Sequence, residues 1–183
     1  MLPSNCYSKN RITVDGAVIH YISAKNVNPN DPFNVNTAID ILKNIRLSYK
    51  GLITREGEYI ELVPENFKQY HAGYSIMNGR EDCNSFTNGY ALIGGSAWEY
   101  EYNQILKLGE VLAQDMTANN YSLDWIKGHD EVRAEWRENY PDRIKYFQDK
   151  NEGYKVSKKY DPGAHFKWGI LKDMLRGLSK VSQ

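Results

Sequence analysis

Short apolar runs alternate with longer amphipathic segments along this chain, a pattern that predicts strands interleaved with helices. Residues 17–23 form a brief, β-branched run opened by Asp15-Gly16, which favours a buried strand over a helix. Residues 89–94 form a second apolar run typical of a core strand, and a shorter strand is expected over residues 124–129. These three runs supply the centre of a predicted sheet.

Two further strands and a long loop are expected between these runs. The strand-like segments 49–54 and 59–63 are joined by four residues that include Gly57, which is available for a positive φ, so a hairpin is predicted. Residues 64–87 are rich in Asn, Gly and polar side chains and show no periodicity. Such a segment indicates a long surface loop of the kind that often carries function.

Three helices are predicted from apolar residues at helical spacing. Thr37 with Asp40, and Ser96 with Glu99, have the three-residue offset of a capping box and place the first two helix starts. Strands interleaved with helices predict an α/β fold, although the pattern does not fix the sense of each strand pair. The expected helices and their apolar residues are 37–46 (Ala38, Ile39, Leu42, Ile45), 97–118 (Trp98, Tyr102, Ile105, Leu108, Leu112, Met116) and 164–178 (Trp168, Leu171, Leu175, Leu178).

Composition narrows the function classes. The 183 residues are 41% hydrophobic, 25% charged and 13% aromatic, which is typical of one globular domain over residues 1–183 and excludes a disordered chain. Lys plus Arg equals Asp plus Glu at 23 each, so no global field attracts nucleic acid or anionic lipid, and neither partner is expected. Without a signal peptide pattern or an apolar run of about 18 residues, the protein is expected to be a soluble monomer, cytoplasmic at synthesis, with no membrane insertion.

Two parts of the sequence stand outside this pattern. Cys6 and Cys83 provide neither a disulfide framework nor a CxxC motif, so reduced thiols are expected. Residues 130–159 contain seven acidic and eight basic residues with aromatic residues between them. This charged stretch predicts a solvated helix plus loop over the core.

Candidate chemistry centres on the histidines. Of the four, His20 and His129 each end a strand-like run, and Asp161 lies in a Pro-Gly turn that would hold its carboxylate on a stiff loop. Two imidazoles and one carboxylate give three protein ligands and leave a fourth position for water, as in a catalytic zinc site. The alternative is that Asp161 caps the final helix, and spacing alone leaves both interpretations open.

A set of ordered blocks resembles the zinc-dependent N-acetylmuramoyl-L-alanine amidases, with the greatest likeness to phage lysozymes (endolysins) of the amidase type. The set is specific although each block alone is weak. The resemblance implies an amidase-like fold, in which a central mixed β-sheet is flanked by helices. The blocks are Val18-Ile-His-Tyr-Ile-Ser23, Ser48-Tyr-Lys-Gly-Leu-Ile-Thr-Arg-Glu-Gly57, Tyr70-His-Ala-Gly73, Gly79-Arg-Glu-Asp-Cys-Asn84, Gly89-Tyr-Ala-Leu-Ile-Gly-Gly95, Gly128-His129 and Lys159-Tyr-Asp-Pro-Gly163.

Carried over residue by residue, the resemblance implies one Zn²⁺ ion held by His20, His129 and Asp161. Lys159 matches the family lysine that supports the oxyanion, and Tyr49 matches the catalytic tyrosine of the phage lysozymes. For Tyr49, an orienting and proton-relay role is favoured, because a phenol with a pKa near 10 is a poor base at pH 7. The resemblance also places the 64–87 loop beside the muropeptide. The expected substrate-binding residues are His71, Arg80 and Asn84.

Three departures from the family pattern stand out. Ala91 replaces the glutamate base of bacterial recycling enzymes, and Lys50 follows Tyr49 where many members have histidine. Between His129 and Asp161 lie 31 residues, whereas relatives have about a dozen, which indicates an insertion near the site at about residues 131–158. The aromatic residues of the insertion suggest a lid, or a surface over the cleft that contacts the cell wall. None of these departures removes a metal ligand, and no separate wall-binding domain is expected.

The sequence therefore predicts a zinc peptidoglycan hydrolase that cleaves the amide between N-acetylmuramic acid and L-alanine of the stem peptide. A phage endolysin that reaches the wall through holin-type release into the periplasm is the expected biological setting. The alternatives are a non-catalytic peptidoglycan-recognition module, a bacterial muropeptide-recycling amidase and an antibacterial toxin amidase. Peptidoglycan or a muropeptide is the expected partner in each case.

Overall fold

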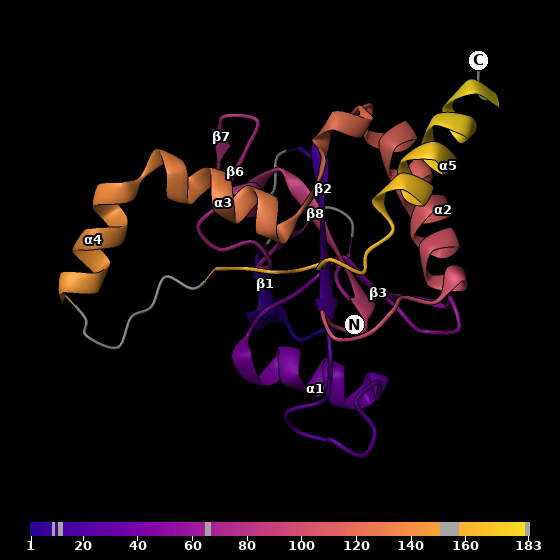
Figure 1. The fold of residues 1–183 in the computed structure, drawn as a ribbon, viewed down its shortest axis with the longest axis horizontal. Helices are drawn as coiled ribbons and strands as arrows, with labels where there is room; N and C mark the ends of the chain where they lie inside the picture. The colour runs from indigo at the N-terminus through magenta and orange to yellow at the C-terminus, as the bar shows by residue number, and fades with distance from the viewer. Residues whose placement is uncertain (9, 11–12, 65–66, 151–157, 182–183) are drawn as a thin grey trace.

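The computed structural model describes residues 1–8, 10, 13–64, 67–150 and 158–181 (Figure 1). Residues 151–157, the end of the predicted insertion, lie outside the described residues. A five-stranded sheet runs through the centre, in the order β4-β3-β8-β2-β9. The pairs β3–β8, β8–β2 and β2–β9 are parallel, and β3–β4 is antiparallel. The α/β fold with a central mixed sheet is thus confirmed.

Most of the predicted strands and helices lie close to their predicted ranges, and the predicted 64–87 loop also contains three short strands, β5, β6 and β7. Of the described helices, none has the length and apolar character needed to cross a membrane. The strands are β1 (Tyr7–Ser8), β2 (Gly16–Ile22), β3 (Gly51–Ile53), β4 (Tyr59–Glu61), β5 (Lys68–Gln69), β6 (Ile76–Met77), β7 (Arg80–Glu81), β8 (Thr87–Ile93) and β9 (Ile126–Gly128). The helices are α1 (Val35–Ile45), α2 (Tyr102–Asn119), α3 (His129–Asn139), α4 (Pro141–Lys150) and α5 (Trp168–Val181), with 3-10 turns at Ser4–Cys6, Cys83–Ser85 and Leu123–Trp125.

Alternation along β2 divides the core into two layers. Successive strand side chains point to opposite faces, so Ile19 packs with the residues of α2 and α5, whereas Ile22 packs with those of α1. Figure 1 shows α2 and α5 side by side and α1 apart from them. His20 is on the same face as Ile22, and it is therefore placed beside the α1 layer rather than in the α2–α5 core. Tyr49, Leu52 and Ala91 belong to this layer too.

Both capping-box predictions were wrong in position. Asn34 caps α1, because its side chain accepts a hydrogen bond from the Thr37 backbone N–H at 2.8 Å, and the helix starts two residues earlier than predicted. Glu101 caps α2 together with Gln104. The carboxylate of Glu99, which the sequence had assigned to a cap at Ser96, instead binds other side chains.

The predicted hairpin is confirmed, with Gly57 at φ +87° between β3 and β4. Three residues expected on apolar helix faces are exposed: Ile45 is 55% exposed at the end of α1, Tyr102 is 62% exposed at the first turn of α2, and Leu178 is 38% exposed on α5. Cys6 and Cys83 are buried free thiols, as expected. His129 does not end a strand; it is the first residue of α3, immediately after β9.

The predicted insertion begins as a packed element. Trp136 of α3 is 1% exposed and forms a small apolar cluster with Ile76 of β6. Backbone N–H groups of Asn78 and Gly79 donate to the Glu135 carboxylate at 3.2 and 2.7 Å. These contacts fasten α3 to the β6–β7 segment, so α3 forms a fixed wall beside the sheet.

Candidate metal centre

Three segments that are distant in the sequence bring His20, His129 and Asp161 together. His20 is the fifth of the seven residues of β2, so it does not end the strand as predicted; it lies opposite Ala91 of β8 and is 1% exposed. His129 opens α3, whose first turn is closed by a bond from the Gly128 N–H to the Glu131 carboxylate at 2.7 Å. The candidate ligand atoms of the three residues all lie within 4.8 Å of one another.

Asp161 is held by its backbone rather than by a helix. Its carbonyl accepts the Asp130 N–H at 2.9 Å, and the Tyr100 hydroxyl donates to the neighbouring Pro162 carbonyl at 2.6 Å. Helix α5 begins only at Trp168, so Asp161 does not cap the final helix. The carboxylate is free to face the imidazoles.

Hydrogen bonds on the far side of each imidazole decide which nitrogen faces Asp161. His129 Nε2 lies 3.2 Å from the Ala72 carbonyl, and His71 Nε2 lies 3.3 Å from the Thr87 carbonyl. A carbonyl only accepts, so both nitrogens carry the hydrogen in neutral rings. His71 Nδ1 then accepts from His20 Nε2 at 3.1 Å. Both His20 and His129 therefore present a bare Nδ1.

These two bare nitrogens point at one carboxylate oxygen. Asp161 Oδ2 is 2.9 Å from His20 Nδ1 and 3.0 Å from His129 Nδ1. Burial and the neighbouring His129 lower the pKa of His20 to about 4, so its ring is neutral near pH 7.

Three electron-rich atoms converging without a proton between them fit a bound cation. Imidazole nitrogens with one carboxylate oxygen suit a borderline divalent metal such as zinc, and three protein ligands leave a position for a further ligand. The outward hydrogen bonds to Ala72 and His71 fix the orientation of the two imidazole rings, as is usual for metal-ligating histidines. These donor atoms thus fit the metal that the sequence predicted.

Tyr49 and Lys159 border this cluster in different ways. The Tyr49 ring is 8% exposed, with its centroid 4.8 Å from that of His20. Burial, reinforced by the Asp161 charge, raises the pKa of Tyr49 well above 10, so the phenol keeps its proton. Lys159 is exposed two residues before Asp161 and lines a cavity together with His129.

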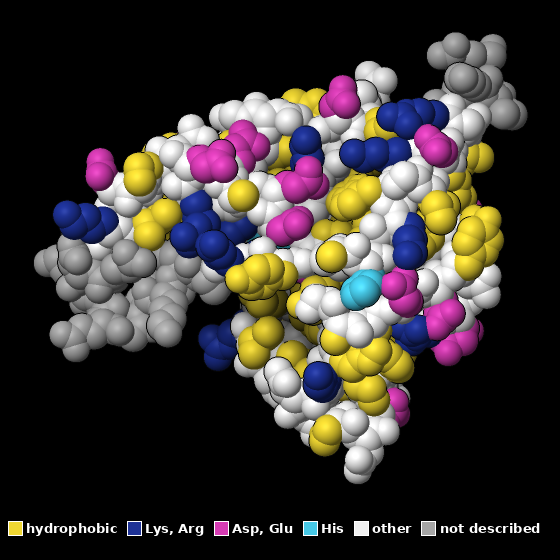
Figure 2. Space-filling model, viewed as in Figure 1, with side chains coloured by type: hydrophobic (Ala, Val, Ile, Leu, Met, Phe, Trp, Pro, Cys, Tyr) yellow, Lys and Arg dark blue, Asp and Glu magenta, His cyan; other side chains and the backbone are white. Residues whose placement is uncertain are grey.

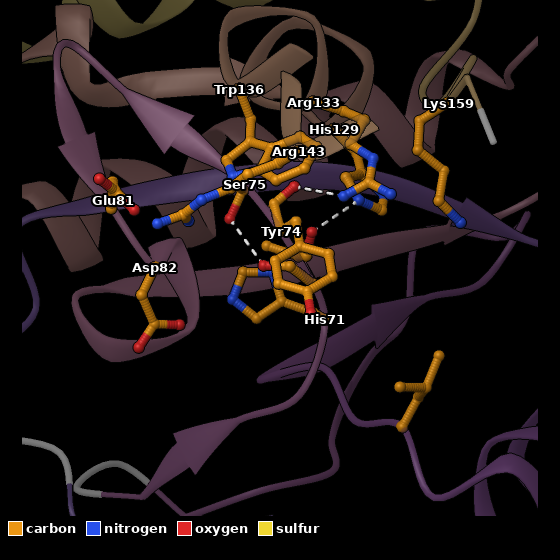
Figure 3. A pocket seen from close by; sticks show the side chains of 13 residues that line it. His71, Tyr74, Ser75, Glu81, Asp82, His129, Arg133, Trp136, Arg143 and Lys159 are labelled. Atoms are coloured by element: carbon orange, nitrogen blue, oxygen red, sulfur yellow. Dashed lines mark hydrogen bonds between the residues drawn. The ribbon is translucent and has the colours of Figure 1, made fainter. Parts of the chain in front are cut away.

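That cavity has a volume of about 530 Å³, and His129 is the one of the three converging residues that lines it (Figure 3). The cavity is lined by residues of the 71–75 segment, α3 and α4, by Glu81 and Asp82 at the end of β7, and by Lys159 just before Asp161. Figure 3 shows Arg133, His129 and Lys159 along one side, with Glu81 and Asp82 at another. The lining residues are Leu47, His71, Ala72, Gly73, Tyr74, Ser75, Glu81, Asp82, His129, Arg133, Trp136, Arg143 and Lys159.

Comparison with family models matches residues 10–164 to the N-acetylmuramoyl-L-alanine amidases (Amidase_2). The chain belongs to this amidase family. Among curated relatives, the 1,6-anhydro-N-acetylmuramyl-L-alanine amidase AmpD of Enterobacter cloacae is 30% identical over 134 residues, which cover 73% of this chain. The match spans 60% of that relative's length.

Solved amidase structures share the fold. A selenomethionine derivative of AmpD superposes with a TM-score of 0.66 at 24% identity, covering 94% of this chain and 92% of the other. The Clostridium intestinale endolysin amidase LysCS gives 0.64 at 18% identity, covering 93% and 88%. AmiD of E. coli, solved with anhydro-N-acetylmuramic acid-L-Ala-D-γ-Glu-L-Lys, gives 0.63 at 19% identity, covering 95% and 60%. At these identities the likeness concerns the fold.

The three residues expected to bind substrate occupy different environments. His71 is 4% exposed, and its ring orients His20 as described above, although it also borders the cavity. The Asn84 side-chain oxygen accepts the N–H groups of His71 and Ala72 at 2.9 and 2.8 Å and so holds the 71–75 segment. Arg80 pairs with Asp15 at 2.5 Å. Arg80 and Asn84 are not among the described residues that line the cavity.

Sequence reasoning did not identify several residues of the site. The ring of His71 fits only because residue 89 is glycine: a Cβ there would lie 2.7 Å from His71 Cγ. The Ala72 and Thr87 carbonyls that fix the imidazoles leave no signature in side-chain identity. Arg133 and Arg143 belong to the predicted insertion, whose mix of charges and aromatics did suggest a surface over the cleft.

Proposed function

We propose that this protein is a zinc-dependent N-acetylmuramoyl-L-alanine amidase that hydrolyses the bond between N-acetylmuramic acid and L-alanine of the stem peptide. The observation that carries the proposal is the convergence of His20 Nδ1, His129 Nδ1 and Asp161 Oδ2 beside a cavity of about 530 Å³. Family membership and the AmpD relatives support the reaction. Residues 1–183 are proposed to act as one amidase domain.

One zinc ion is proposed to be held by the two imidazoles and the carboxylate. When bound, it supplies Lewis-acid chemistry, which polarises a carbonyl and favours ionisation of water near neutral pH. Lys159 lines the same cavity as His129 and is proposed to stabilise the oxyanion that develops on the amide carbonyl. Removing one such donor typically costs about two to three decades in rate.

Tyr49 is proposed to orient the attacking water or to pass its proton toward the leaving amine. Its pKa, raised by burial, excludes a role as a base at pH 7, but a neutral phenol can donate a hydrogen bond. Ala91 lies opposite His20 in the sheet, at the place of the family glutamate. Its methyl side chain has no ionisable group, so it cannot act as an acid or a base there. The chain's own proton handling is thus assigned to Tyr49.

Purified sacculi provide the test of this reaction. The zinc-loaded protein is expected to release free L-alanine amino termini, and mass spectrometry of the digest should show stem peptides separated from intact glycan. Asp161→Asn keeps the shape of the side chain but weakens the metal site, so this variant should release neither free amino termini nor stem peptides. New sugar reducing ends without new amino termini would contradict the proposal. Wall binding that survives in His129→Ala, with no cleavage by the parent protein, would favour a recognition module.

The finer proposal concerns the form of the substrate. We propose that the intact wall polymer is cut, as by an endolysin, because Tyr49 lies against His20 and Ala91 replaces the glutamate base of recycling enzymes. Action on the wall would then follow holin-type release from the cytoplasm, a step that rests on kinship alone. The match to AmpD favours the second candidate, a 1,6-anhydromuropeptide amidase. Rates on sacculi and on anhydromuropeptide, measured side by side, separate the two.

A further inference from the structure

A row of positive charges follows one side of the cavity, from the metal centre to helix α4. Arg133, Arg143 and Lys159 all line it. Figure 2 shows a group of basic side chains near the start of the segment that leads to α5, with acidic side chains further along α3. Glu81 and Asp82 border the cavity from the β7 segment. The cavity is therefore polarised, with cations on the side of α3 and α4.

Arg143 is held in place by aromatic contacts. Its guanidinium carbon lies 4.4 Å from the centroid of the Tyr140 ring, and that ring lies 5.7 Å from the ring of Trp136. Trp136 is buried, and the Tyr140 hydroxyl donates to the Glu81 carboxylate. The position of Arg143 is thus fixed by α3 and by the β7 segment.

Arg143 forms no ion pair within the described part of the chain. No carboxylate among the described residues forms an ion pair with Arg143 or with Lys159. Arg133 differs, because it is buried and donates to the Tyr74 carbonyl at 2.6 Å, which gives it a structural contact. Arg143 is therefore the cation on the α4 side that is available to a ligand.

An arginine without an ion-pair partner is suited to bind a carboxylate ligand, because two N–H groups of its planar guanidinium can donate to the two carboxylate oxygens at once. The peptide in the AmiD complex, L-Ala-D-γ-Glu-L-Lys, has two such groups: the α-carboxylate that γ-linkage leaves free and the terminal carboxylate. Resting on the function proposed above, we propose that Arg143 binds a carboxylate of the stem peptide and so determines specificity for the acidic over the amidated peptide. This role falls to α4, within the insertion that the sequence predicted at about residues 131–158.

The test compares three substrates: anhydro-N-acetylmuramic acid-L-Ala-D-γ-Glu-L-Lys, the same compound amidated at the glutamate α-carboxylate, and the same compound amidated at the terminus. Arg143→Gln is expected to lower kcat/KM on the acidic substrate about tenfold, the size typical of one solvent-accessible charge-assisted bond. On one of the two amidated substrates, the variant and the parent protein should agree within twofold, and that substrate identifies the carboxylate. Lys145→Gln is the matched control: it removes one charge from the same exposed helix at a residue that does not line the cavity.

An equal loss on all three substrates, or no loss on any, would overturn the proposal, as would a similar loss in Lys145→Gln. Calorimetric binding of the free peptide L-Ala-D-γ-Glu-L-Lys gives a readout that needs no turnover. There, Arg143→Gln should weaken binding of the acidic peptide about tenfold and leave one amidated peptide unaffected. If the parent protein cleaves none of these substrates and also releases no L-alanine amino termini from sacculi, the proposed function fails. The peptide titration still decides the role of Arg143.

Discussion

The hydrogen-bonded chain from His20 through His71 to the Thr87 carbonyl gives a quantitative prediction. Replacing His71 with Phe keeps a ring of similar size but removes the acceptor for the His20 Nε2–H, which is 3.1 Å from His71 Nδ1. Leaving a buried N–H unsatisfied costs about 1–3 kcal/mol. His20 would then gain from turning its ring or changing tautomer, and either change removes the Nδ1 lone pair from the metal position.

At 1.36 kcal/mol per decade, this cost corresponds to a loss of about 10- to 100-fold in zinc affinity, the range typical of second-shell substitutions. Competition with a chromophoric zinc chelator at pH 7 measures it. His71→Asn is the informative partner, because an amide oxygen near the position of Nδ1 can still accept, and most of the affinity should return. His165→Phe changes an exposed histidine that pairs with Glu99, and it should leave zinc affinity unchanged.

Two results would refute this reasoning. Zinc affinity of the folded His71→Phe protein within twofold of the parent value would mean that the bond to His71 does not orient His20. Equal losses in His71→Phe and His71→Asn would mean that the shape of the His71 ring matters and its acceptor does not. Far-ultraviolet circular dichroism and a thermal melt establish that each variant is folded.

Three further outcomes are expected. Gly89→Ala should weaken zinc binding about tenfold, because the new Cβ would lie 2.7 Å from His71 Cγ. Competition with a zinc chelator measures this loss. The control is Gly169→Ala, whose new Cβ has open space around it and which should leave zinc affinity unchanged. Tyr49→Phe should lower kcat about 100-fold with the zinc content unchanged, and loss of zinc by elemental analysis would contradict a proton-relay role. Burial lowers the pKa of His20 from 6.5 to about 4. Between these pH values the unfolded chain therefore binds a proton at His20 that the folded protein does not bind. The metal-free protein should lose up to about 3 kcal/mol of folding stability as the pH falls from 6.5 to 4. Urea unfolding at several pH values measures this loss, and an equal pH dependence in His20→Gln would contradict it.

Periodicity predicted the sheet well because burial alternates strictly there. Residues 17–22 separate into two faces with distinct partners, and a one-residue error would exchange them. Helix starts were less predictable, since the same three-residue offset recurs nearby. Glu99 could have capped a helix at Ser96, but its carboxylate binds His165 and Lys167 at 2.7 and 2.8 Å, and those partners come from more than 60 residues away.

The metal centre was predictable to the extent that side-chain identity encodes it. His20, His129 and Asp161 are chemically distinctive, and their order along the chain carried the family resemblance. The orienting contacts were not predictable, because they use backbone carbonyls of Ala72 and Thr87 that any residue could supply. Arg80 illustrates the reverse case. It resembled a substrate-binding arginine in sequence, but the fold places Asp15 beside it.

The most direct test of the central claim is the X-ray absorption spectrum of the protein loaded with one equivalent of zinc. A zinc site built from His20, His129 and Asp161 should show two imidazole nitrogens at about 2.0–2.1 Å from the zinc and oxygen ligands at about 2.0–2.2 Å. In His129→Ala, the spectrum of any zinc retained should have one imidazole fewer. A sulfur shell near 2.3 Å, or an unchanged spectrum in His129→Ala, would contradict a site built from His20, His129 and Asp161.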